Sequence, residues 1–146
     1  MSKRNPKNLN RALWTAQVLV ALLFLFAGSM KFIMPAEKMQ QGSVILPIAF
    51  IHFIGICECL GALGLIVPGV FRIRTSLTPL AAAGLTIIMV GAVVVSVLGF
   101  GVAAAILPAV VGVITTLIAY ARTNVVPLSD APVRPLRVAQ SYSHQH

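Results

Sequence analysis

The sequence predicts an all-α protein, a bundle of four transmembrane helices. Hydrophobic residues make up 58% of the 146 residues and charged residues only 10%, whereas about a quarter of a soluble domain is charged. The mean hydropathy is +0.95. The third observation is a series of uncharged stretches long enough to cross the ~30 Å hydrocarbon core of a bilayer. A soluble fold is therefore excluded, and the chain reads as one membrane domain.

The first apolar stretch predicts a helix near residues 12–34. It follows a basic segment, residues 1–11, and its first 19 residues carry no charge. The core of a signal peptide is shorter, about 7–15 residues, so we expect a retained membrane helix. Proline cannot continue a helix, so Pro35 predicts its end and an outer loop over residues 35–46.

The second helix is predicted near residues 47–67. Pro47 suits the first helical turn, and Pro68-Gly69 is typical of a helix end. A short basic connector follows, with Arg72 and Arg74. Thr78-Pro79 then predicts the start of the third helix, with Thr78 as its N-cap and Pro79 as its first helical residue.

The third and fourth helices share one uncharged run of 47 residues between Arg74 and Arg122. As a single helix this run would extend roughly 70 Å, more than twice the hydrocarbon thickness. Gly99-Phe100-Gly101 is the natural break, which gives helices near residues 77–98 and 102–120. Pro108 should kink the fourth helix. The membrane domain then covers residues 12–122, and residues 123–146 form a mobile tail.

Charge distribution predicts the orientation of the bundle. Four helices place both termini on one side, and the segments on that side hold nine of the eleven Lys and Arg residues. Only Lys31 and Lys38 lie on the other side. Basic residues favour the cytoplasmic side, so both termini are expected there. The basic residues do not form a face interleaved with aromatic residues, so the expected partner is the lipid bilayer and not nucleic acid.

Glu58 is the strongest candidate for a functional residue. It lies alone in the apolar run of the second helix, where a carboxylate costs about 2.5–3.5 kcal/mol, and the chain has only three acidic residues. Helical spacing places Gly55, Gly61 and Ala62 on the same face. Small residues let a second helix approach, so this face should point into the bundle.

A stripe on the first helix offers partners for Glu58. Gln17, Ala21, Phe24, Gly28 and Lys31 follow one another at helical spacing. Gln17 and Lys31 would then form a polar pocket with Glu58, and His52 lies at an outer depth like that of Lys31. Counted along the helices, the gap from Lys31 to Glu58 approaches 10–15 Å, so a water molecule or a polar ligand would have to bridge it.

Simpler interpretations of these residues stay open. Lys31 can snorkel to the headgroups, Glu58 can be a protonated carboxyl bonded to a neighbouring helix, and His52 can be an interfacial residue. Cys57 and Cys59 point to nearly opposite sides of a helix and are expected to be packing residues. No catalytic motif is present, and neither a metal nor a haem is expected.

Three stretches resemble the DoxX-like family of small four-helix bacterial membrane proteins. They are residues 26–32, residues 53–69 and residues 72–84, and the resemblance extends over about residues 12–122. It implies a four-helix bundle in the bacterial inner membrane and marks Lys31 and Glu58 as recurring charged positions. The family's namesake is associated with a thiosulfate:quinone oxidoreductase, which makes quinone a candidate ligand. Family members carry a histidine late in the third helix, where this chain has Val94-Val95-Ser96-Val97.

The function expected from these observations is a non-catalytic membrane subunit or a small-molecule or quinone-binding protein. The alternatives are a quinone-coupled oxidoreductase subunit and a small exporter or carrier. A second copy of the chain and a membrane redox protein are the candidate protein partners.

Overall fold

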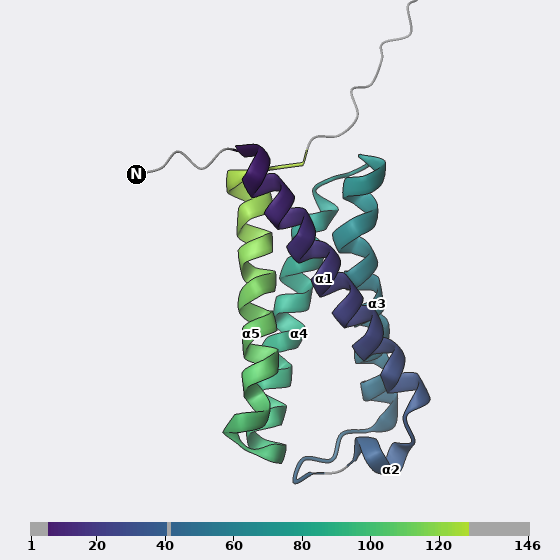
Figure 1. Ribbon diagram of the computed structural model, residues 1–146. Helices are drawn as coiled ribbons and strands as arrows, with labels where there is room; N and C mark the ends of the chain where they lie inside the picture. Colours follow the sequence, from purple (N-terminus) through teal and green to yellow (C-terminus); the bar gives the residue numbers. More distant parts are fainter. Residues whose placement is uncertain (1–5, 41, 129–146) are drawn as a thin grey trace, which may run out of the picture.

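Four long helices dominate the computed structural model, which describes residues 6–40 and 42–128 (Figure 1). The elements in chain order are α1 (Pro6–Ile33), α2 (Ala36–Met39), α3 (Ile48–Phe71), α4 (Leu77–Phe100), α5 (Val102–Tyr120) and the π-helical turn η1 (Ala121–Val125). Each long helix is long and apolar enough to cross a membrane, η1 included with α5. The predicted all-α bundle of four transmembrane helices is confirmed.

Helix α1 begins at Pro6, six residues before the predicted start. The prediction followed the apolar run, which marks the part of a helix inside the bilayer and not its end. Proline is favourable at the first helical position, and Lys and Arg continue a helix readily where water is available. The predicted outer loop likewise contains a short helix, α2, because Pro35 serves as its N-cap.

Helix α3 continues through Pro68, so the predicted end at residue 67 is wrong. Pro68 removes the backbone hydrogen bond to the Gly64 carbonyl, a loss that membrane helices tolerate where neighbouring groups satisfy the freed carbonyl. The helix ends at Arg72, whose backbone is left-handed with φ of 52° and whose N–H donates to the Pro68 carbonyl. Arg74 is also left-handed, so two arginines occupy positions in this connector that usually favour glycine.

The predicted N-cap at Thr78 is also wrong, because α4 begins at Leu77. The connector carbonyls satisfy the first backbone donors: Leu77 N–H donates to Arg74 O and Thr78 N–H to Thr75 O. The Thr78 side chain is fully buried instead. The predicted break between the last two helices lies at Gly101, whose φ of 92° is available mainly to glycine.

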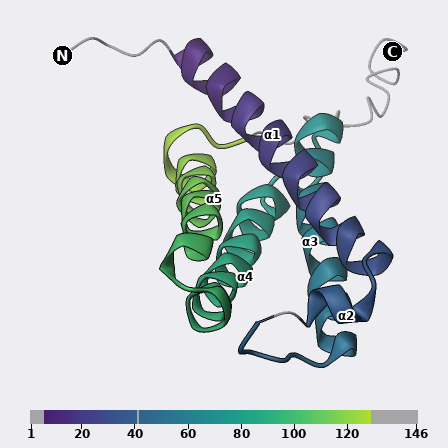
Figure 2. The ribbon, with the colours of Figure 1, turned by 60° about the horizontal axis from the view of Figure 1, so that its bottom comes forward.

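The helices pack as two neighbouring pairs. Helix α1 packs on α3 and α4 packs on α5, while α3 also contacts α4. In Figures 1 and 2, α1 crosses obliquely from the end of α5 toward the start of α3. The core consists of buried aliphatic and aromatic side chains from all four long helices, among them Phe24, Leu65, Leu85 and Ile118. Many other large apolar side chains are exposed, as expected for helices that face lipid.

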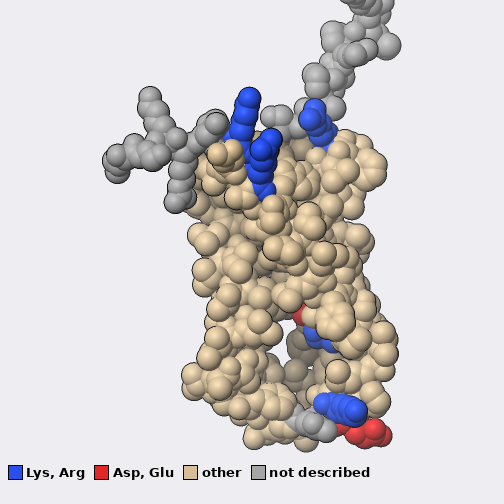
Figure 3. Space-filling model, viewed as in Figure 1, with Lys and Arg blue, Asp and Glu red and all other residues tan. Residues whose placement is uncertain are grey.

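Charged side chains lie mainly at the two ends of the bundle (Figure 3). The view shows a broad uncharged belt between them, and a hollow in its lower half where one basic and one acidic group are visible. Residues 129–146 lie outside the described part of the chain, as does most of the predicted tail. The sidedness of the termini stays a prediction.

Candidate functional site

Lys31 and Glu58 form a direct ion pair inside the bundle. The Lys31 ammonium donates to Glu58 Oε2 at 2.6 Å. The Glu58 side chain is only 4% exposed, whereas that of Lys31 is 27% exposed. The pair therefore presents its ammonium, and not its carboxylate, to the surroundings.

Two glycines bring the helices of this pair together. A Cβ atom on Gly28 of α1 would lie 2.9 Å from the Gly55 carbonyl oxygen and 3.4 Å from Glu58 Cβ. A Cβ on Gly55 would lie 3.1 Å from the Gly28 carbonyl oxygen. The backbones of α1 and α3 are thus close enough that only glycine fits at this crossing.

The expected gap of 10–15 Å between Lys31 and Glu58 is wrong. That distance assumed that the end of α1 and the start of α3 lie at the same depth in the membrane. Glu58 instead faces Gly28, and Lys31 follows Gly28 by three residues, or about 4.5 Å along the helix. A lysine side chain spans this distance, so neither water nor a ligand is needed to join the two charges.

The other packing residues contact different parts of the bundle. Gly61 faces α4, because a Cβ there would lie 2.6 Å from the Leu85 side chain. Ala62 belongs to the core and is 1% exposed. The small residues around Glu58 therefore let α3 approach two neighbours, α1 through Gly55 and α4 through Gly61.

His52 and Gln17 do not join the ion pair. The His52 ring stacks on Phe32 of α1, with ring centroids 5.1 Å apart. Gln17 is fully buried, but its Nε2 donates to the Leu65 carbonyl at 2.8 Å and its Oε1 accepts from Arg122 Nε at 2.7 Å. Gln17 precedes Lys31 by fourteen residues, about 21 Å of helix. Its place in the pocket was predicted from a shared helix face, which says nothing about depth.

Gln17 belongs instead to a second polar cluster, which we call the Arg122 cluster: Asn10, Trp14, Gln17 and Arg122. Arg122 Nη1 donates to Asn10 Oδ1 at 2.7 Å, and the guanidinium lies 5.6 Å from the centroid of the Trp14 ring. The Arg122 side chain is buried, with 2% of the residue exposed. Sequence reasoning placed Arg122 at the end of the membrane domain and gave it no polar partner, although the spacing of Asn10, Trp14 and Gln17 along one helix face could have indicated one.

A cavity of about 640 Å³ lies beside the Lys31–Glu58 pair, between α3 and α4. Its walls are apolar except for Lys31, Cys57 and Ser96. Phe50, Phe53 and Val94 line it and are also exposed on the outer surface of the bundle. The cavity is therefore open toward the space that lipid occupies.

A smaller cavity of about 290 Å³ lies on the other side of Lys31. It is lined by Ala27, Met30, Met34 and Met39, and it shares Lys31 and Ile51 with the larger cavity. Lys31 thus stands between two cavities, one toward α2 and one between α3 and α4.

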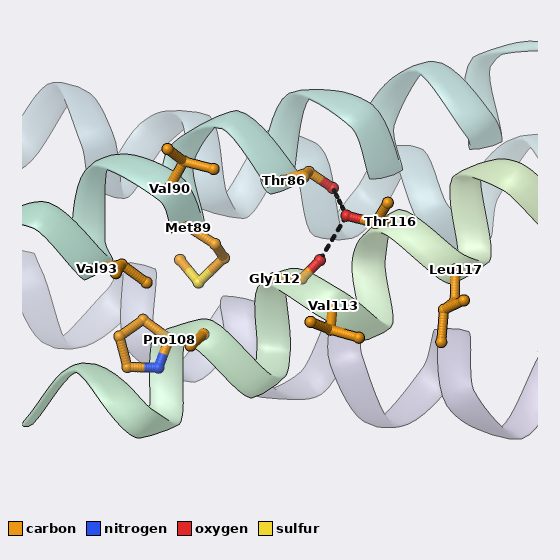
Figure 4. A pocket seen from close by; sticks show the side chains of 10 residues that line it. Thr86, Met89, Val90, Val93, Pro108, Gly112, Val113, Thr116 and Leu117 are labelled. Atoms are coloured by element: carbon orange, nitrogen blue, oxygen red, sulfur yellow. Dashed lines mark hydrogen bonds between the residues drawn. The ribbon is translucent and has the colours of Figure 1, made fainter. Parts of the chain in front are cut away.

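A separate groove between α4 and α5 is structural in character (Figure 4). Its polar groups are Thr86 and Thr116, and the Thr116 hydroxyl lies within hydrogen-bonding distance of both Thr86 Oγ1 and the Gly112 carbonyl of its own helix. The Thr86 hydroxyl in turn is directed to Thr115 Oγ1 at 2.9 Å. These hydroxyls are satisfied within the helix pair, as expected for threonines in a membrane.

Within residues 6–40 and 42–128, no three His, Cys, Asp or Glu side chains gather in a group that could hold a metal ion. Cys57 and Cys59 are free thiols. The described site therefore consists of one ion pair, the cavities around it, and the separate Arg122 cluster.

A family model described as the DoxX-like family matches residues 15–119. No curated protein and no solved structure matches the chain significantly. The matched range includes α3, α4 and most of α1 and α5. It contains the Lys31–Glu58 pair, whereas Gln17 is the one member of the Arg122 cluster inside it.

Proposed function

Because the chain belongs to the DoxX-like family and is a multi-pass membrane protein, we propose that it binds a small amphipathic molecule beside the Lys31–Glu58 pair. It does so as a non-catalytic protein of the bacterial inner membrane. The ligand has an apolar body, which the walls of the larger cavity match, and a polar head that accepts hydrogen bonds from Lys31.

The larger cavity is the observation that supports this proposal. Its volume of about 640 Å³ falls in the range of small-molecule sites, about 300–1,000 Å³. Apolar walls with few polar groups are typical of such sites. The exposed apolar side chains on its rim favour a ligand that dissolves in the bilayer and enters sideways.

Lys31 determines the chemistry of the head group. An ammonium has three N–H donors, and among the described residues Lys31 donates to one acceptor, Glu58. The remaining donors suit a carbonyl, carboxylate or similar acceptor. A quinone is one molecule of this class, since it combines carbonyl oxygens with an apolar body.

The test is mass spectrometry of small molecules that copurify with the protein from native membranes. Gly91 lines the cavity, and a Cβ there meets nothing within 4 Å. Gly91→Phe should therefore fill the cavity without disturbing the helix and should abolish ligand retention. Gly84→Phe is the matched control, because a Cβ on Gly84 also meets nothing within 4 Å and Gly84 does not line this cavity. Equal retention in both variants would refute the proposal.

A carrier or exporter is the second candidate function. The observation in its favour is that Lys31 and Ile51 line two cavities at once, as a residue on a passage would. Uptake of the copurified molecule into proteoliposomes, lost in Lys31→Met, would favour transport over binding alone. A retained quinone together with a defined redox partner would favour the oxidoreductase-subunit alternative.

A further inference from the structure

Arg122 is a buried charge without an acidic partner among the described residues. Only 2% of the residue is exposed. The acceptors that it contacts are neutral: the Gln17 and Asn10 side-chain amides and the Val126 carbonyl. Of the described acidic residues, Glu37 lies in α2 and Glu58 is bonded to Lys31. Buried charges are normally paired, because an unpaired charge in an apolar interior is costly.

The guanidinium also has unused donors. It carries five N–H groups, of which Nε–H and the two on Nη1 are directed to acceptors at 2.7, 2.7 and 3.3 Å. Nη2 is buried and has no hydrogen-bond partner. The second buried polar atom without a partner among the described residues is Thr78 Oγ1, in the first turn of α4. Helix α4 contacts η1, which contains Arg122.

The backbone at Arg122 is unusual as well. Residues Ala121–Val125 form a π-helical turn, closed by a bond of 2.7 Å from Val126 N–H to the Ala121 carbonyl. Such turns are rare and are frequent at functional sites. They change the direction in which side chains leave the helix, and here Arg122 points into the bundle.

The surroundings of this cluster favour a negative charge. Lys7 and Arg11 flank Asn10 on α1, and Arg72 and Arg74 lie in the connector before α4. The N-terminus of α4 adds a partial positive charge. An anion at this end of the bundle would meet cations and unused donors, and no described carboxylate.

We propose that Arg122 is the central residue of a binding site for a phosphate-class oxyanion. Phosphate oxygens accept the planar pair of donors that a guanidinium offers. Arg122 lies near the end of the apolar span that α5 forms with η1, and the end of a membrane span is at the depth of the lipid phosphates. The anion is therefore the phosphate of a lipid headgroup or free phosphate.

Binding at Nη2 requires movement of a covering segment, since this atom is buried. Residues 126–128 are the best candidate. Two hydrogen bonds fix this segment. The bond from Arg122 Nη1 to the Val126 carbonyl is the longest of the three that Arg122 makes, at 3.3 Å. The other runs from the Thr75 hydroxyl to the Leu128 carbonyl at 2.9 Å. The anion replaces the Val126 carbonyl as the acceptor when this segment shifts.

The test is thermal unfolding of the delipidated full chain in neutral detergent. The probes are phosphatidylglycerol, inorganic phosphate, and a galactosyl diacylglycerol that lacks phosphate. We expect phosphatidylglycerol to raise Tm and the galactolipid to leave it unchanged. An equal rise with inorganic phosphate would identify free phosphate as the ligand, and a rise with the phospholipid alone would identify the headgroup. If neither phosphate compound raises Tm of the unsubstituted protein, the proposal is overturned, and no variant is needed to reach that conclusion.

Substitutions then assign the effect to Arg122. Arg122→Gln should weaken phosphate binding at least about tenfold, the scale of a lost charge-assisted bond. Lys38→Gln is the control, because it removes an exposed cation from α2, at the opposite end of the bundle, and should keep the affinity within about threefold. If Arg122→Gln does not fold, Arg122→Lys keeps the charge but lacks the planar donor pair, and should show the same tenfold loss. Unchanged affinity in the Arg122 variant that folds would overturn the proposal.

Discussion

Separating Lys31 from Glu58 should reveal a strong coupling between the two side chains. At 2.6 Å and an effective dielectric constant of 20, their attraction is about 6 kcal/mol. Desolvation offsets several kcal/mol of this for each ion. Lys31 is 27% exposed and keeps part of its solvation, so we expect a net coupling of about 1–3 kcal/mol.

The single variants should differ in their effect. Lys31→Met leaves a carboxylate in a site that is 4% exposed, which should cost about 3 kcal/mol, the lower end of the range for a broken buried pair. Glu58→Gln should cost less, because the longer lysine side chain can turn toward a more polar surrounding.

The double variant Lys31→Met/Glu58→Gln completes the cycle. It leaves no uncompensated charge, so it should recover part of the stability that Lys31→Met loses. Reversible unfolding in mixed micelles measures the free energy of all four proteins. A coupling below about 0.5 kcal/mol, near the scatter of independent sites, would refute the reasoning and leave Lys31 as a snorkelling residue.

Three further predictions concern packing, orientation and the thiols. Gly28→Ala should destabilise the protein by about 1–3 kcal/mol, because its Cβ would lie 2.9 Å from the Gly55 carbonyl oxygen. Gly84→Ala is the control and should be neutral or stabilising, because a Cβ there meets nothing within 4 Å. Equal effects of the two variants in chemical unfolding would contradict the close crossing of α1 and α3. In a chain with both native thiols replaced, cysteines at positions 5 and 140 should react only from the cytoplasmic side and one at position 38 only from the periplasmic side; periplasmic labelling at position 140 would refute the orientation. Replacing Cys57 and Cys59 with Ala should leave ligand retention within about twofold, because Cys57 is one of fourteen residues around the cavity and a small change of volume there has little effect. Complete loss of retention with the fold intact, as seen by circular dichroism, would show that the thiols take part.

The sequence predicts the four helices well, because the length of each charge-free run can be read from the chain and compared with the thickness of the bilayer. It predicts helix ends poorly. The start of α4 and the end of α3 depend on backbone hydrogen bonds between the helix ends and the connector, and composition does not reveal these bonds. Pro68 is an example, since it looks like a stop signal and lies within the helix.

The candidate site was predicted in part. Charge alone pairs Lys31 with Glu58, because few ionisable residues lie within the apolar runs. Depth could not be predicted, since it depends on how far α1 slides along α3, and the Gly28–Gly55 contact sets that position. Gln17 was assigned to the wrong cluster for the same reason. Arg122 was missed because its burial depends on the π-helical turn at the end of α5.

The contact between α3 and α4 explains why a cavity exists beside the ion pair. At one end, a Cβ on Gly61 would lie 2.6 Å from Leu85, and one on Gly64 would lie 2.7 Å from Ala81. Toward the other end, larger side chains line the cavity between the two helices, among them Phe50, Phe53 and Val95. Two helices that touch closely at one end and carry bulky residues at the other must diverge, and the space between them widens toward Lys31. The glycines of α3 therefore do more than allow close packing: they fix the point from which the helices separate, and so place the ammonium where a ligand head would lie.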